Sequence, residues 1–119
     1  MNILILEDDR LLNKAISVSL EDSKHKTCCC FNGNEALAVL ENRKVDLIVA
    51  DLMIPEKAGL NFLIVLQNTT KFNIPLIIIS ALENAPTLIE RYHFNCIAFF
   101  KKPVDPDLIL DQINRLNLQ

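Results

Sequence analysis

The stretch ILILEDD, residues 3–9, decides the fold: a short, unbroken apolar run ends abruptly in three consecutive acids. Apolar runs of this length that do not alternate with polar residues are typical of strands buried on both faces, as in a parallel sheet. In an open α/β sheet, ligands bind outside the carboxyl ends of such strands. We therefore expect Glu7 and Asp8 to lie at a binding site.

The same arrangement recurs along the chain. Further apolar runs lie near residues 27–31, 45–50, 76–79 and 96–100. Three of them also end in a polar side chain with potential chemistry, namely Asp51, Ser80 and Lys102. Four of the five expected strands thus carry a functional group at their carboxyl ends.

The segments between these runs have the apolar spacing of amphipathic helices. They cover residues 11–20, 36–40, 60–66, 87–92 and 108–116. Asn32, three residues before Glu35, resembles a capping box, and Asp105-Pro106 combines a good N-cap with proline in the first turn.

Five alternations of strand and helix predict a doubly wound, flavodoxin-like α/β domain with a five-stranded parallel sheet, five helices and right-handed crossovers. The common strand order for such a sheet is 2-1-3-4-5, with its switch point between strands 1 and 3. That order brings Glu7, Asp8 and Asp51 to one crevice. With no repeat or linker in 119 residues, we expect a single domain spanning residues 1–119.

Composition excludes several other classes. The net charge of −3 argues against non-specific binding to nucleic acid or to an anionic membrane. No apolar run is long enough to span a bilayer, and no signal peptide is evident. The four cysteines lack zinc-site spacing and are expected to be reduced, buried thiols. These features favour a cytoplasmic protein that contacts neither nucleic acid nor membrane.

The acids at the expected crevice indicate a metal site. Three carboxylates held together repel one another, and a divalent cation is the usual compensation. Oxygen ligands suit Mg²⁺ or Mn²⁺. A solvated acidic loop would explain Glu7 and Asp8 alone, but it explains less well why Asp51 joins them. With Lys102 and Ser80 available to bind an anionic group, the cluster suits phosphoryl transfer to Asp51 as the nucleophile.

Taken together, these motifs resemble the receiver domain of two-component response regulators, over the whole chain. The matching pieces are ILILEDD at residues 3–9, DLMIP at 51–55 with Gly59 four residues on, Ser80-Ala81, and Lys102-Pro103. The resemblance implies that Asp51 accepts a phosphoryl group from a phosphohistidine of a sensor histidine kinase, or of a histidine phosphotransfer protein in a phosphorelay. It also implies that Mg²⁺, or Mn²⁺, is held by Glu7, Asp8, Asp51 and the backbone carbonyl of Met53.

The resemblance further implies a conformational switch. Ser80 would rotate toward the phosphoryl group, Lys102 would pair with it, and the ring of Phe99 would swing inward. These movements would remodel the face made by the fourth helix, the fifth strand and the fifth helix, where an output partner binds. Such a domain is no conventional enzyme, because it catalyses only its own phosphorylation and slow dephosphorylation.

The chain departs from the family pattern at a few positions. Ala58 stands where aspartate is frequent, and Phe99 replaces a frequent tyrosine. Asn95 lies where a Gly-Ala pair is common, so we expect it to supply a left-handed turn before the last strand. Met53 and Leu82, which would flank the hydrolytic water, are both apolar and predict slow loss of the phosphoryl group.

Three alternatives belong to other classes. A receiver-like module that binds partners without phosphorylation would share the fold. An aspartyl phosphatase is disfavoured because Met53 stands where such enzymes carry a second acid. Flavin binding is disfavoured because no phosphate-binding loop rich in serine, threonine or glycine follows the first strand.

Overall fold

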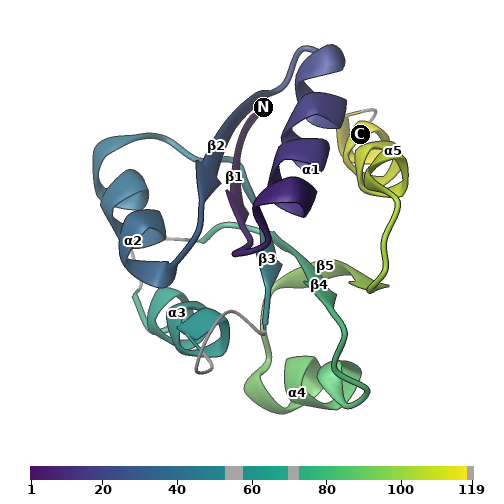
Figure 1. The fold of residues 1–119 in the computed structure, drawn as a ribbon. Helices are drawn as coiled ribbons and strands as arrows, with labels where there is room; N and C mark the ends of the chain where they lie inside the picture. Colours follow the sequence, from purple (N-terminus) through teal and green to yellow (C-terminus); the bar gives the residue numbers. More distant parts are fainter. Residues whose placement is uncertain (53–57, 70–72, 118–119) are drawn as a thin grey trace.

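The computed structural model describes residues 1–52, 58–69 and 73–117, in which strands and helices alternate strictly (Figure 1). The elements are β1 (Asn2–Leu6), α1 (Arg10–Asp22), β2 (Lys26–Cys30), α2 (Gly33–Asn42), β3 (Leu47–Asp51), α3 (Ala58–Gln67), β4 (Leu76–Ser80), α4 (Ala85–Tyr92), β5 (Cys96–Lys101) and α5 (Pro106–Asn117). The predicted succession of five strands and five helices is confirmed. Met53, expected to contribute a metal-binding carbonyl, lies outside the described residues.

The sheet is parallel throughout and has the predicted order β2-β1-β3-β4-β5. Helices α1 and α5 cover one face, while α2, α3 and α4 cover the other (Figure 1). β1 connects outward to the edge strand β2, and the chain then returns to β3 on the other side of β1. This reversal opens the crevice at the carboxyl ends of β1 and β3.

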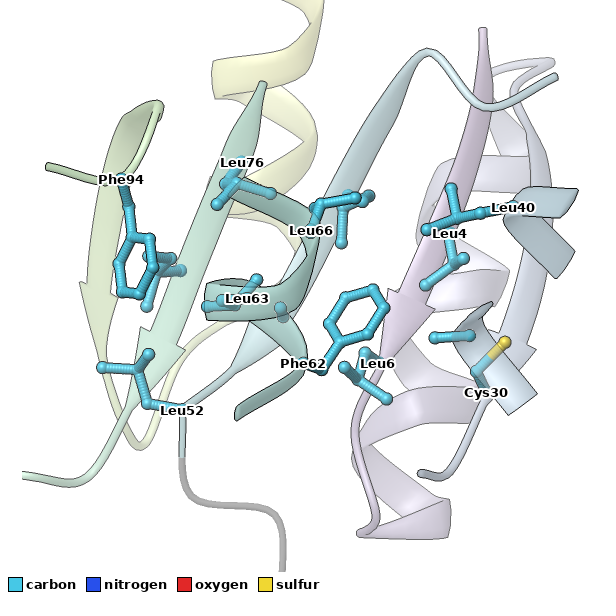
Figure 2. Packing of buried hydrophobic residues seen from close by; sticks show 14 of the residues in the cluster. Leu4, Leu6, Cys30, Leu40, Leu52, Phe62, Leu63, Leu66, Leu76 and Phe94 are labelled. Carbon is cyan, nitrogen blue, oxygen red and sulfur yellow. The ribbon is translucent and has the colours of Figure 1, made fainter. Parts of the chain in front are cut away.

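Each face of the sheet builds its own hydrophobic core. On the α1/α5 side, Ile3 and Ile5 of β1 pack with Ile16 of α1 and Ile109 of α5. On the other side, Leu4 and Leu6 of β1 pack with residues of α2 and α3, and Figure 2 shows this second cluster. Successive side chains of a strand point to opposite faces, so both sets in β1 are buried. This double burial explains why the apolar run of β1 in the sequence does not alternate with polar residues.

Two helix N-termini are capped by side chains next to the crevice. The Asp9 carboxylate accepts hydrogen bonds from the N–H groups of Leu11 and Leu12, which fixes the start of α1. Asn32 caps α2 by accepting from the N–H of Glu35, as expected. The reciprocal bond differs from a capping box, because the Glu35 carboxylate accepts from the N–H of Phe31, one residue before the cap. Asp9 is thus used in capping rather than in the acid cluster.

Two expectations are wrong in detail. The left-handed residue before β5 is His93, with φ of 55°, rather than Asn95, because α4 ends at Tyr92 and His93 is its C-cap. Only Cys30 of the four cysteines is buried, whereas Cys29 is exposed and Cys28 and Cys96 are half-buried. Cys28, Cys29 and Cys30 belong to the edge strand β2, which has a neighbouring strand on one side only, and it is less covered than the central strands.

Among the described residues, none of the helices has the length and apolar character needed to cross a membrane.

The difference among the cysteines has a chemical consequence. Burial, and then the neighbouring Cys28, raise the pKa of the Cys30 thiol to about 12. Because the thiolate is the reactive species, we expect iodoacetamide at mildly alkaline pH to alkylate Cys29 and to spare Cys30 in the folded protein. Peptide mass spectrometry after a brief reaction measures this, with denatured protein as the control. Equal labelling of Cys29 and Cys30 in folded protein would contradict the structure.

Candidate functional site

The polar residues predicted from the strand ends lie at one edge of the sheet. Glu7 directly follows β1, Asp51 is the last residue of β3, Ser80 is the last residue of β4, and Lys102 directly follows β5. The N–H of Lys102 donates to the Ser80 carbonyl at 2.9 Å, which keeps the chain after β5 beside the end of β4. Because the strands are parallel and lie in the order β1-β3-β4-β5, all four residues lie at the same crevice.

Lys102 joins the two buried carboxylates. Its Nζ donates to Asp51 Oδ2 at 2.6 Å and forms a second ion pair with Glu7 Oε1. Glu7 is fully buried and Asp51 is 2% exposed. The other Glu7 oxygen accepts from the N–H of Asp9 at 3.1 Å. Burying carboxylates is costly unless they are paired and hydrogen-bonded, and these contacts provide that pairing.

Burial shifts the titration of both partners. It raises the pKa of the Glu7 carboxyl, although hydrogen bonds from Lys102 and from the Asp9 N–H act in the opposite direction. Burial lowers the pKa of the Lys102 ammonium, but hydrogen bonds to Asp51 and Glu7 outweigh this effect and raise that pKa above its ordinary value. Lys102 is therefore a permanent cation at neutral pH, held by the acids it links.

Three carboxylates are placed to share a cation. Glu7, Asp8 and Asp51 each offer an oxygen, and these atoms lie within 4.8 Å of one another. Asp8 is exposed, so the cluster opens to solvent on that side. The three acids and Lys102 leave a formal surplus of two negative charges, which a divalent cation would balance. An all-oxygen donor set with this surplus fits Mg²⁺ or Mn²⁺.

Ser80 and Phe99, the expected switch residues, lie on neighbouring strands. The Ser80 side chain is buried, and its Oγ accepts from the N–H of Leu82 at 3.1 Å. Phe99 is half-buried and packs on the side of the sheet covered by α2, α3 and α4. It faces that side because the register with β4 shifts after Leu76, which leaves Ile97 as an extra residue in β5.

Asn13 also supports the site, although the sequence pattern does not indicate it. It is buried in α1, and its Nδ2 donates to the carbonyls of Glu7 and Cys30. The only trace in the sequence is a polar residue on the apolar stripe that contains Ile16 and Leu20. The guanidinium of Arg10, the first residue of α1, lies 4.1 Å from the centre of the ring of Phe31, which directly follows β2.

The fold and the site define a doubly wound α/β domain with a lysine-paired acid cluster at its switch point. The family model described as "Response regulator receiver domain" matches residues 3–114, and the chain belongs to that family. Receiver domains are the phosphorylation-dependent modules of two-component signalling. They receive phosphoryl groups from sensor kinases, act on output partners, generally bind Mg²⁺, and are not conventional enzymes.

Similar proteins agree with this assignment. The chain is 32% identical over 113 residues to the transcriptional regulatory protein CrdR of Helicobacter pylori, covering 95% of this chain and 53% of that protein. It is 29% identical over 109 residues to response regulator Rre1 of Synechocystis, covering 90% and 47%. The chain thus spans about half the length of the curated relatives it matches.

Solved structures show the same fold. The receiver domain of the Francisella response regulator 1452 matches with a TM-score of 0.83 and 30% identity, covering 97% of this chain and 94% of that one. The chemotaxis response regulator CheY4 of Vibrio cholerae matches with a TM-score of 0.83 at 20% identity, covering 96% of each chain. The second likeness concerns the fold alone.

The ion pairs of Lys102 can be tested by replacing it. Because its hydrogen bond lowers the pKa of Glu7, Lys102→Met should raise that pKa further above the ordinary glutamate value. Carbon-detected NMR titration of the Glu7 carboxyl measures the change. Lys101→Met, at an exposed neighbour outside the ion pairs, is the matched control and should leave Glu7 unaffected. An unchanged or lower Glu7 pKa in Lys102→Met would contradict the arrangement.

Proposed function

We propose that Asp51 is the phosphoacceptor of a signalling switch. Its carboxylate oxygen attacks the phosphorus of a phosphohistidine on a sensor kinase or a histidine phosphotransfer protein. A P–O bond forms as the P–N bond breaks, the electron pair of the P–N bond stays on the ring nitrogen, and the histidine, already protonated on its other ring nitrogen, leaves as neutral imidazole. The observation that carries this proposal is the central place of Asp51, between the acids that follow β1 and the lysine that follows β5.

The two sides of Asp51 suit the two needs of phosphoryl transfer. Glu7 and Asp8 lie on one side and complete an oxygen-lined cation site. Ser80 ends β4 and Lys102 follows β5, on the other side of β3, and Lys102 reaches both Asp51 and Glu7 from there. Both residues can stabilise charge on the transferred oxygens. Among these acids, Asp51 alone ends a strand that lies between β1 and β4, whereas Glu7 and Asp8 follow β1, whose neighbours are β2 and β3.

Glu7, Asp8 and Asp51 fit Mg²⁺ by their donor chemistry, and in a receiver domain the backbone carbonyl of Met53 is expected to complete the set. Bound there, the ion supplies positive charge to the phosphoryl oxygens. The residues of the chain orient the acceptor: Lys102 holds the Asp51 carboxylate in place before transfer. After transfer, Lys102 can exchange that carboxylate for a phosphoryl oxygen without leaving the crevice.

The signal would leave through β4 and β5. To reach the phosphoryl group, the Ser80 hydroxyl breaks its hydrogen bond with the N–H of Leu82, and the loop from β4 to α4 then moves with the Ser80 side chain. The space vacated on that side admits the ring of Phe99. The face of α4, β5 and α5 then changes shape and binds an output partner. This domain would therefore act by binding another protein and would not contact nucleic acid directly. The single-domain extent, residues 1–119, and the cytoplasmic location stay predictions.

One observation favours the alternative of a phosphorylation-independent interaction module. Lys102 already bridges Glu7 and Asp51, so two of the acids have an internal counter-ion. Beryllofluoride, a mimic of the phosphoryl group, separates the two functions when it is added with Mg²⁺. A switch gives a new set of amide NMR signals in α4, β5 and the loop after β4, whereas an interaction module keeps its spectrum.

Replacing the acceptor tests the proposal. With a small phosphodonor such as acetyl phosphate and Mg²⁺, the wild-type domain should gain one phosphoryl group, and Asp51→Asn should gain none. Intact-protein mass spectrometry measures the gain. Asp111→Asn, at an exposed position of α5, is the matched control and should react like wild type. Uptake by Asp51→Asn at the wild-type rate, or uptake that survives chelation of Mg²⁺, would refute the assignment.

The lifetime of the phosphoryl group is a separate prediction. Leu82 is half-buried beside Ser80, and its apolar side chain can neither accept nor donate a hydrogen bond to a hydrolytic water. We expect the isolated domain to lose its phosphoryl group over minutes or longer, and Leu82→Gln to lose it faster than Leu82→Ile. Mass spectrometry after removal of the donor follows the decay. A wild-type half-life of seconds would show that another group positions the water.

A further inference from the structure

Asn13 is a polar residue at a core position of α1. It is 1% exposed and lies on the same helix face as the buried residues Ile16 and Leu20. Its Nδ2 donates to the carbonyl oxygen of Glu7 at 3.0 Å and to that of Cys30 at 3.1 Å, with a longer contact of 3.5 Å to Ile5. One side chain therefore binds the backbone at the carboxyl ends of both β1 and β2.

These bonds complete the support of Glu7. Its N–H donates to the Cys30 carbonyl at 3.1 Å, so this carbonyl accepts from both Glu7 and Asn13. The N–H of Asn13 also donates to the Asp9 carbonyl at 2.9 Å, the first helical bond of α1. Together with Lys102 on the Glu7 carboxylate, the contacts of Asn13 fix the backbone from Glu7 to Asp9, on which two of the three clustered carboxylates stand.

The residue type suits this role. The amide group supplies two donors without charge, and the neighbouring groups are carbonyl oxygens. Asn13 Oδ1 is buried and has no hydrogen-bond partner among the described residues. A buried acceptor without a partner costs free energy, so asparagine is a poor choice for packing alone. The donors at Nδ2 are the part of this side chain that the structure uses.

We propose that Asn13 is a positioning residue of the metal site, which holds Glu7 and Asp8 at the separation a divalent cation requires. The inference rests on the proposed function and adds a residue that touches neither the cation nor the phosphoryl group. Groups that orient metal ligands in this way commonly change metal affinity by 10- to 100-fold when they are removed. Asn13 acts through the main chain of Glu7, so its loss loosens the ligands without removing one.

Two variants separate positioning from general stability. Asn13→Leu keeps a branched side chain of similar shape but loses the donors, and Mg²⁺ should then bind about tenfold more weakly. Ser17→Ala is the matched control, because Ser17 is 5% exposed on the same helix and bonds the Thr27 hydroxyl of β2 at 2.7 Å, away from the crevice. It should lower the melting temperature as well, yet change the Mg²⁺ affinity less than about twofold.

NMR titration with MgCl₂ measures these affinities without any phosphodonor. If Asn13→Leu does not fold, two other measurements replace it: the Mg²⁺ affinity of Asn13→Ser, and the side-chain amide signals of Asn13 in the wild-type protein. The serine variant should bind Mg²⁺ more weakly than wild type, and the Asn13 NH₂ signals should shift along the same binding curve as the amide of Asp8. Equal Mg²⁺ affinities in the Asn13 and Ser17 variants, or Asn13 NH₂ signals that do not shift when MgCl₂ is added, would overturn the positioning role. A wild-type protein that binds Mg²⁺ but takes up no phosphoryl group would refute the proposed function alone.

Discussion

The ion pairs of Lys102 with Glu7 and Asp51 are the interaction on which the site depends. Two carboxylates buried at neighbouring strand ends repel each other, and burial raises the pKa of Glu7. The lysine offsets that repulsion with a charge that its own hydrogen bonds maintain. The site is therefore stable when it is at rest, yet its surplus of negative charge remains available for a divalent cation and its lysine for an incoming anion.

The sequence predicts all five strands, but the local pattern does not encode the details of the two edge strands. β1, β3 and β4 are buried on both faces, so their apolar runs specify strand, parallel sheet and functional strand ends together. β2 and β5 lie at the edges, where burial is incomplete. The exposure of Cys29 and the extra residue Ile97, which turns Phe99 toward α4, depend on neighbours that the local pattern does not encode.

The sequence likewise predicts some residues of the site and not others. Glu7, Asp8, Asp51, Ser80 and Lys102 were predicted because each follows an apolar run, and a parallel sheet aligns the ends of such runs. Asn13 escaped notice because its importance comes from a carbonyl of β2, seventeen residues further along the chain. Asp9, the third acid of the same block, was not expected to face Asp51, and the structure shows that it caps α1 instead.

We propose that this arrangement makes Asp51, among all the acids of the crevice, the one that forms an acyl phosphate. Reduction of the phosphorylated domain with borohydride converts an aspartyl phosphate to homoserine, and peptide mass spectrometry then locates it in the chain. We expect homoserine at position 51 in the wild-type domain and at no other aspartate. Reduction at Asp8 or Asp9, or no reduction after prolonged incubation with acetyl phosphate and Mg²⁺, would contradict it.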